Sequence, residues 1–186
     1  MISPIDIKNE IYKNKKDLFK SFFYKNTNDL HFKKIKKLRK FRTIVIIGMG
    51  GSILGSKAIY SFLKHKIKKK FIFIDNLDQF FLKKIHKEEN LNKALFLIIS
   101  KSGNTNETII NSSYFKSFFK KSNVIIISEN KNNVLSKLAR QKNFIFVKHN
   151  HYIGGRYSVF SEVGMVPAYL MGLNVKKFKE KLPNYL

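Results

Sequence analysis

The sequence predicts an α/β protein, a three-layer α/β/α sandwich built around a mainly parallel five-stranded sheet. Its five strand-length apolar runs are rich in β-branched and aromatic residues, and they are nearly continuous, as expected for strands covered on both faces. Longer amphipathic segments separate the runs, a spacing typical of helical crossovers between parallel strands. A chain of 186 residues, 44% of them hydrophobic, is long enough for one domain with its own core.

The elements of the sheet follow from these runs in order. We expect strands at Thr43–Ile47, Phe71–Asp75, Ala94–Ser100, Val124–Ser128 and Phe144–Lys148. The amphipathic segments predict connecting helices at Ile53–Lys64, Gln79–Glu89, Thr105–Lys120 and Asn133–Gln141. The pattern leaves the order of the strands open.

Helical segments are also expected on either side of the sheet. Residues 1–40 are predicted as an N-terminal helical segment, with apolar residues near helical spacing at Ile7, Ile11, Leu18, Phe22, Phe23, Leu30, Ile35 and Leu38. The main domain is expected to span residues 41–173. It ends on the apolar stretch Val159–Leu173, which is short for a membrane span and contains Glu162 and Pro167. We therefore expect a buried helix there.

Composition excludes several classes of site. The formal net charge is +25, but lysines are spread over the whole chain and arginine occurs only at positions 39, 42, 140 and 156. Nucleic-acid binding is therefore not expected as the main function, since base reading and stacking favour arginine and exposed aromatic residues. Cysteine is absent and the five histidines lack ligand spacing, so we expect no metal and no cofactor. The N-terminus lacks a signal-peptide pattern, and we expect a cytoplasmic protein.

The first candidate loop, here called the glycine loop (residues 48–56), follows the first predicted strand and contains Gly48, Gly50, Gly51 and Gly55. A glycine turn that leads into a helix presents backbone N–H groups and the positive end of the helix dipole to an anion. A dinucleotide fingerprint would need a sixth-position glycine, where this chain has Ile53. A tight turn without a ligand remains the structural alternative.

The second, the hydroxyl loop (residues 100–108), follows the third predicted strand. Hydroxyl side chains surround one ammonium there, at Ser100, Ser102, Thr105 and Thr108 around Lys101. Hydroxyl donors and helix-start amides suit the acceptor oxygens of a phosphate. The structural alternative is a capping box between Asn104 and Glu107, with the serines as turn residues.

The third, the arginine loop (residues 154–158), follows the fifth predicted strand and reads Gly-Gly-Arg-Tyr-Ser. Because parallel strands end at one edge of their sheet, all three loops are expected on the same rim. Arg156 could supply fixed positive charge where an enediolate oxygen develops. A structural ion pair of Arg156 is the alternative.

In order and approximate spacing, these three motifs together resemble the glucose-6-phosphate isomerase family, and the hydroxyl loop alone resembles the wider class of sugar-isomerase (SIS) domains. The resemblance covers roughly residues 40–173. It implies an SIS-like fold and the interconversion of glucose 6-phosphate and fructose 6-phosphate in glycolysis and gluconeogenesis.

The resemblance also implies roles for individual residues. Arg156 would stabilise the enediolate, with Lys101 as supporting charge. The residues implied in substrate binding are Gly51, Ser52, Ser100, Lys101, Ser102, Thr105, Thr108, Gly155 and Arg156, and no metal is implied.

The family's proton-transfer groups, a Glu, a His from a neighbouring subunit and a Lys, match no residue of this chain. Glu162, His149 and His151 lie near the arginine loop, but we expect solvated or core roles for them. Residues 174–186 would then begin an apparently missing second half. The resemblance implies a homodimer for the full-length family, or a second chain that supplies the missing half, and this chain alone would be inactive. A non-catalytic sugar-phosphate-binding SIS regulator is the alternative, and a dinucleotide-binding domain a more distant one.

Overall fold

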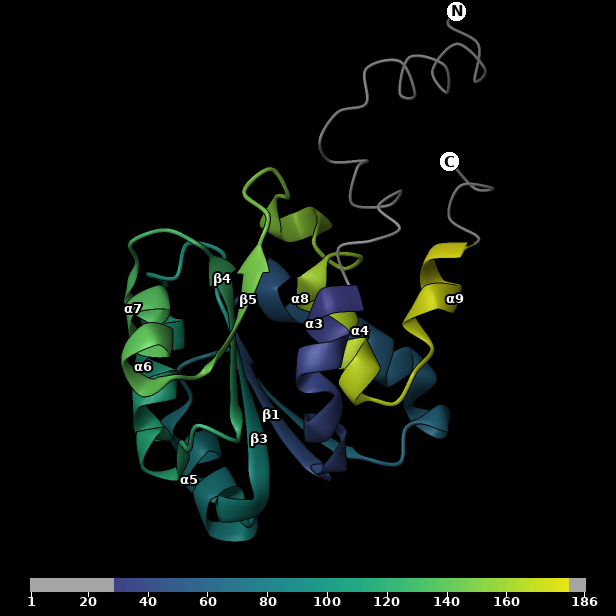
Figure 1. The fold of residues 1–186 in the computed structure, drawn as a ribbon. Helices are drawn as coiled ribbons and strands as arrows, with labels where there is room; N and C mark the ends of the chain where they lie inside the picture. Colours follow the sequence, from purple (N-terminus) through teal and green to yellow (C-terminus); the bar gives the residue numbers. More distant parts are fainter. Residues whose placement is uncertain (1–28, 181–186) are drawn as a thin grey trace, which may run out of the picture.

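The computed structural model describes residues 29–180 and has the expected sandwich architecture (Figure 1). Five parallel strands form one sheet in the order β2-β1-β3-β4-β5. Their bounds are β1 Thr43–Gly48, β2 Lys70–Ile74, β3 Ala94–Ile99, β4 Val124–Glu129 and β5 Ile145–His149. Each strand end lies within one residue of its predicted position, which confirms the predicted strands.

The continuous apolar runs arise because the sheet is covered on both faces. Ile44 and Ile46 of β1 belong to the core cluster on one face, and Val45 and Ile47 belong to the cluster on the other. All four side chains are fully buried. Strands in such a central position need no polar alternation.

Helices divide between the two faces as the clusters do. One face is covered by α5 Gln79–Glu88, α6 Asn106–Tyr114 and α7 Val134–Lys142, and the other by α3 Asp29–Ile35, α4 Gly51–Leu63, α8 Glu162–Leu170 and α9 Val175–Glu180. Figure 1 shows the two groups on opposite sides of the sheet, with α6 and α7 on the left and α4 and α8 on the right. Short 3-10 turns (η1 to η5) occur at Lys36–Lys40, Lys64–Lys66, Leu91–Lys93, Lys116–Phe118 and Gly155–Tyr157.

Two helices are shorter than predicted. The segment expected to be helical from Thr105 to Lys120 breaks after Tyr114, where the N–H of Phe115 bonds to the carbonyl of Ser112, three residues back instead of four. This tightening buries the Phe115 ring completely in the core. The helix expected within Val159–Leu173 occupies Glu162–Leu170 and begins after Ser161, whose side chain accepts a hydrogen bond from the Val163 N–H.

The segment ahead of the sheet is described only in part. Ile35 and Leu38 are buried in the core cluster that also contains α4 and α8. The predicted helical face at Ile7, Ile11, Leu18, Phe22 and Phe23 lies outside the described residues. Within residues 29–180, none of the helices is long and apolar enough to cross a membrane.

The strand order fixes where a ligand could bind. After β1 the chain enters α4 on one face of the sheet, and after the adjacent β3 it enters α6 on the other. This is the topological switch point, the place beyond the carboxyl ends of the strands where α/β sheets bind their ligands. The glycine loop follows β1 and the hydroxyl loop follows β3, so both predicted loops lie at this point.

Candidate functional site

Three hydroxyl groups of the hydroxyl loop face one another. Ser100 Oγ lies 2.8 Å from Thr105 Oγ1, and Ser102 Oγ lies 3.4 Å from each of them. Ser100 is buried, whereas Ser102 is exposed and Thr105 is half-buried. The cluster thus has one buried side and one side open to solvent.

The start of α6 adds backbone donors to this cluster. Thr105 is the N-cap residue but makes no side-chain capping bond. The first N–H groups of a helix lack partners within the helix, so those of α6 can bind an anion. The capping-box alternative for Asn104 and Glu107 is wrong, because Asn104 Oδ1 instead accepts a hydrogen bond of 3.0 Å from the Val134 N–H of α7.

Lys101 joins the hydroxyl loop to the chain that leads into the arginine loop. Its Nζ donates a hydrogen bond of 2.8 Å to the His151 carbonyl and lies 3.7 Å from Glu129 Oε1. The ammonium is therefore held between the carboxyl ends of β4 and β5.

The glycine loop and the arginine loop are in direct backbone contact. A Cβ added to Gly51 would lie 2.1 Å from the Gly155 carbonyl oxygen. Ser158 Oγ is within hydrogen-bond distance of two carbonyl oxygens, 2.9 Å from that of Gly51 and 2.6 Å from that of Gly155. The structure therefore brings all three predicted loops together, as expected from parallel strands.

Arg156 lies in the 3-10 turn η5 of the arginine loop and is exposed. Within residues 29–180 it forms no ion pair with a carboxylate. The structural ion pair that was the alternative explanation for this residue is thus not seen among the described residues. The guanidinium remains available to an anionic group.

Glu129 provides the negative charge nearest to Lys101. Burial by itself would raise the pKa of the Glu129 carboxyl, but a hydrogen bond from Lys131 and the positive charges of Lys131, Lys101 and His149 outweigh it, so the pKa is lowered. Lys131 Nζ lies 2.5 Å from Glu129 Oε2. The carboxylate therefore stays charged and balances the lysines beside the hydroxyl loop.

The acidic and histidine residues near the arginine loop, for which solvated or core roles were expected, differ in burial. His149 and Glu162 are buried, with Nδ1 of the imidazole 3.7 Å from Oε2 of the carboxyl. His151 is exposed and contributes its carbonyl to the Lys101 contact.

The remaining predicted ligands lie around these contacts. Gly51 and Ser52 form the first turn of α4 and are half-buried. Thr108 lies on α6 and is fully buried, and its Oγ1 has no hydrogen-bond partner within the described part of the chain. Its predicted help in binding phosphate stays a prediction.

Two residues that hold these loops in place have no role predicted from the sequence. Ser158 was predicted only as the last residue of the Gly-Gly-Arg-Tyr-Ser motif, yet its side chain links the arginine loop to the glycine loop. Asn133 was predicted only as the start of a helix, yet its side chain contacts Gly103 of the hydroxyl loop. An Asn ahead of an apolar helical pattern signals an N-cap, but nothing in the local sequence indicates a contact with a distant loop.

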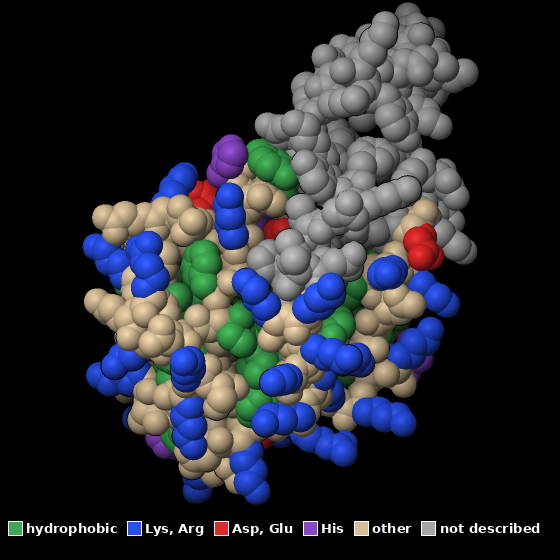
Figure 2. All heavy atoms as spheres, in the orientation of Figure 1, with side chains coloured by type: hydrophobic (Ala, Val, Ile, Leu, Met, Phe, Trp, Pro, Cys, Tyr) green, Lys and Arg blue, Asp and Glu red, His purple; other side chains and the backbone are tan. Residues whose placement is uncertain are grey.

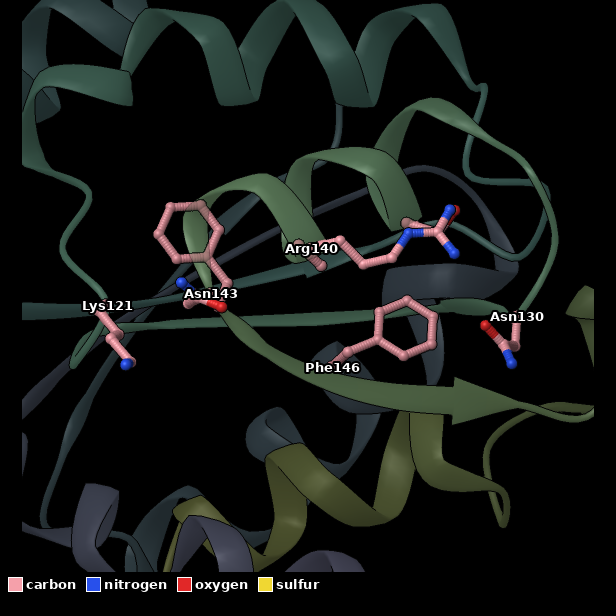
Figure 3. A pocket seen from close by; sticks show the side chains of 8 residues that line it. Lys121, Asn130, Arg140, Asn143 and Phe146 are labelled. Carbon is pink, nitrogen blue, oxygen red and sulfur yellow. The ribbon is translucent and has the colours of Figure 1, made fainter.

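Other features of the described residues lie away from the loops. A pocket of about 330 Å³ between α7 and β5 is lined by Arg140, Asn130 and Phe146 among others, and contains none of the predicted substrate residues (Figure 3). Across residues 29–180 there is no group of three or more His, Asp or Glu that could hold a metal ion. Figure 2 shows lysine and arginine scattered over the visible face instead of gathered in one stripe.

Comparisons with known proteins show which family the chain resembles. The sequence profile of the phosphoglucose isomerase family matches residues 7–182. The chain is 37% identical over 158 residues to glucose-6-phosphate isomerase of Methanocaldococcus jannaschii, which covers 82% of this chain and 38% of that protein. The chain therefore spans little more than a third of that relative's length.

Solved structures show the same fold. A glucose-6-phosphate isomerase from Chlamydia trachomatis superimposes with a TM-score of 0.67 at 28% identity, over 81% of this chain and 30% of that one. The sugar isomerase domain of the RpiR transcription factor from Sphaerobacter thermophilus superimposes with a TM-score of 0.59 at 9% identity, over 94% of this chain and 92% of that one. The fold is thus that of a sugar-isomerase domain.

Proposed function

The chain belongs to the phosphoglucose isomerase family, and from that premise we propose that its three loops bind a hexose 6-phosphate by the phosphate group. The observation that carries the proposal is the convergence of the Ser100, Ser102 and Thr105 hydroxyls at the uncapped start of α6. A phosphate offers several acceptor oxygens at once, which matches several short donors better than a single ion pair does.

Two further features support this site. The cluster lies at the topological switch point, where the glycine loop can approach the sugar from the neighbouring strand. Arg156 is exposed beside the glycine loop and unpaired within the described part of the chain, so it can meet the oxygens of the substrate. Its fixed charge suits the stabilisation of an enediolate, with Lys101 as supporting charge.

In the complete protein the reaction would be the aldose–ketose interconversion of glucose 6-phosphate and fructose 6-phosphate. This needs acid and base groups for ring opening and for moving a proton between adjacent carbons. Those groups match no residue of this chain, so they would come from a longer form of the protein, expected to be a homodimer, or from a second chain. The family's glycolytic role supports a cytoplasmic location.

A non-catalytic sugar-phosphate-binding regulator is the second candidate. It is favoured by the likeness to the sugar isomerase domain of a transcription factor, which matches this chain over nearly the whole length of both. An open reading frame downstream of codon 186 that encodes a second domain with a catalytic Glu would favour the enzyme. A stop codon with no such partner gene would favour the regulator.

The proposal is tested by calorimetric titration of the chain with glucose 6-phosphate in the presence of a chelator. Unphosphorylated glucose is the matched control, because it lacks only the group that the hydroxyl cluster would hold. Binding of glucose 6-phosphate but not of glucose supports the proposal. Equal binding of both at millimolar concentration, or binding of neither, contradicts it.

A further inference from the structure

We propose that Asn133 is a positioning residue for the hydroxyl loop, holding Gly103 so that the three hydroxyls converge on the phosphate. The inference rests on the proposed function of that loop, but the contacts that carry it are features of the ligand-free protein. Asn133 lies at the start of α7 and contacts neither Ser100, Ser102 nor Thr105 by any hydrogen bond among the described residues.

The first contact is steric. Gly103 has φ +69°, a backbone conformation that side chains rarely adopt, and a Cβ there would lie 2.1 Å from Asn133 Oδ1. The carboxamide of Asn133 thus fills the space directly beside Gly103. The turn between Ser102 and Asn104 packs against this carboxamide.

Hydrogen bonds hold the Asn133 carboxamide in one orientation. Asn133 is buried, and its Nδ2 donates hydrogen bonds of 3.0 Å to the Glu129 carbonyl and 3.3 Å to Ser128 Oγ. Its Oδ1 accepts a bond of 2.8 Å from the Ser136 N–H at the N-terminus of α7. With both ends of the carboxamide engaged, the side chain cannot rotate away from Gly103 without losing these bonds.

Backbone hydrogen bonds also join the end of β4 and the start of α7 to the hydroxyl loop. The Leu135 N–H donates to the Gly103 carbonyl at 3.1 Å, and the Glu129 N–H donates to the Lys101 carbonyl at 3.1 Å. Residues 101–103 are therefore fixed from the β4–α7 side. The Gly103 N–H in turn donates to Ser100 Oγ at 3.1 Å, so a shift of Gly103 moves the cluster directly.

Two substitutions separate the contact of Asn133 with Gly103 from its role as the N-cap of α7. Asn133→Ser keeps a good N-cap acceptor for α7 but removes the carboxamide, whereas Asn133→Ala removes both. If Asn133 positions the loop, both variants should lose affinity for inorganic phosphate about tenfold, as measured by calorimetry. Both variants lose the buried Nδ2 bonds to Ser128 and Glu129, but Asn133→Ala should melt at a lower temperature than Asn133→Ser because it also removes the acceptor that caps α7.

The matched control is Asn174→Ser. Asn174 Oδ1 accepts hydrogen bonds from the Lys176 and Lys177 N–H groups at the start of α9, on the opposite face of the sheet. This control makes the same substitution at a helix start without touching the hydroxyl loop. Its affinity for phosphate should equal that of the wild type.

A second readout needs no ligand. Amide exchange of Gly103 in the free protein should accelerate about tenfold in Asn133→Ser and remain unchanged in Asn174→Ser. If the wild type fails to bind phosphate, the proposed function fails, but accelerated exchange at Gly103 would still support the positioning role. Wild-type exchange at Gly103 in Asn133→Ser, or wild-type phosphate affinity where the parent binds, would overturn the inference.

Discussion

The Ser158 hydroxyl lies 2.9 Å from the Gly51 carbonyl oxygen, although 107 positions separate the two residues in the chain. This bond joins the loop after β1 to the loop after β5, which are separated by two strands in the sheet. It places the exposed Arg156 beside the start of α4. The relation between these loops is therefore part of the folded domain and requires no ligand to form.

The contact between the glycine and arginine loops predicts different effects on stability for alanine substitutions at two glycines. Gly51→Ala should destabilise the protein by about 1–3 kcal/mol, because the added methyl group would overlap the Gly155 carbonyl oxygen. Gly155→Ala adds the same methyl group where nothing lies within 4 Å and is the control. Chemical denaturation of both variants provides the measurement. Equal stabilities would show that the two loops are not packed together in solution.

The lowered pKa of Glu129 predicts how the free energy of unfolding depends on pH. Because the pKa of its carboxyl is lowered from 4.5 in the folded protein, its stabilising effect is complete above the unfolded pKa and is lost as the pH falls through the folded pKa. Glu129→Gln should therefore reduce the free energy of unfolding by about 1 kcal/mol at pH 7, a modest effect because the paired lysines are partly exposed.

The difference between wild type and Glu129→Gln should shrink as the pH falls below the unfolded pKa of the carboxyl, and it should vanish only below the lowered pKa of the folded state. Urea denaturation from pH 7 down to pH 3 follows it. Glu88→Gln, which removes a carboxylate from the exposed side of α5, is the control for net charge. A constant difference across this pH range would mean that Glu129 acts through packing and not through its charge.

The hydroxyl cluster makes a prediction for ligand affinity. Ser102→Ala combined with Thr105→Ala should weaken binding of glucose 6-phosphate at least tenfold, since each hydrogen bond to a charged group is worth about 1.5–3 kcal/mol. The melting temperature without ligand should stay near the wild-type value, because Ser102 is exposed and the buried Ser100 Oγ, which loses Thr105 as a partner, still accepts a bond from the Gly103 N–H. Ser113→Ala, an exposed hydroxyl further along α6, is the control. A large drop in melting temperature would identify the loop hydroxyls as structural.

Turnover is predicted to be absent from this chain alone. The loops can position phosphate and stabilise negative charge, but loss of one positioned acid or base typically removes about 10²–10⁴-fold of rate. A coupled assay on the purified chain, before and after addition of a chain carrying the second domain, provides the measurement. Substantial activity of the single chain that is abolished by Glu162→Gln or His151→Ala would show that residues within it transfer the protons.

The sequence alone was sufficient to predict the five strands and to place the three loops at one edge of the sheet. Long apolar runs such as Ala94–Ile99 can be interpreted directly, because burial on both faces removes any need for polar alternation. Strand order was not predictable, since every β–helix–β unit has the same local pattern whichever neighbour its strand pairs with. The switch point between β1 and β3 therefore emerged only from the fold.

Side-chain contacts in the site were less predictable, because their partners are distant in the sequence. The spacing of Asn104 and Glu107 matched a capping box, but the carboxamide of Asn104 bonds to Val134, 30 positions away. The contact of Asn133 with Gly103 likewise joins positions in different loops. Local rules describe what a residue can bond to, whereas the fold decides which partner is within reach.

The central claim, that the hydroxyl loop holds the phosphate, is tested most directly by mapping amide chemical shifts of the isotope-labelled chain during titration with glucose 6-phosphate. The largest changes are predicted at Gly103 and through the first turn of α6, with smaller changes at Gly51 and Gly155. Titration with glucose should leave these amides unchanged. Changes centred on the pocket between α7 and β5, or none at the hydroxyl loop at saturating ligand, would contradict the account.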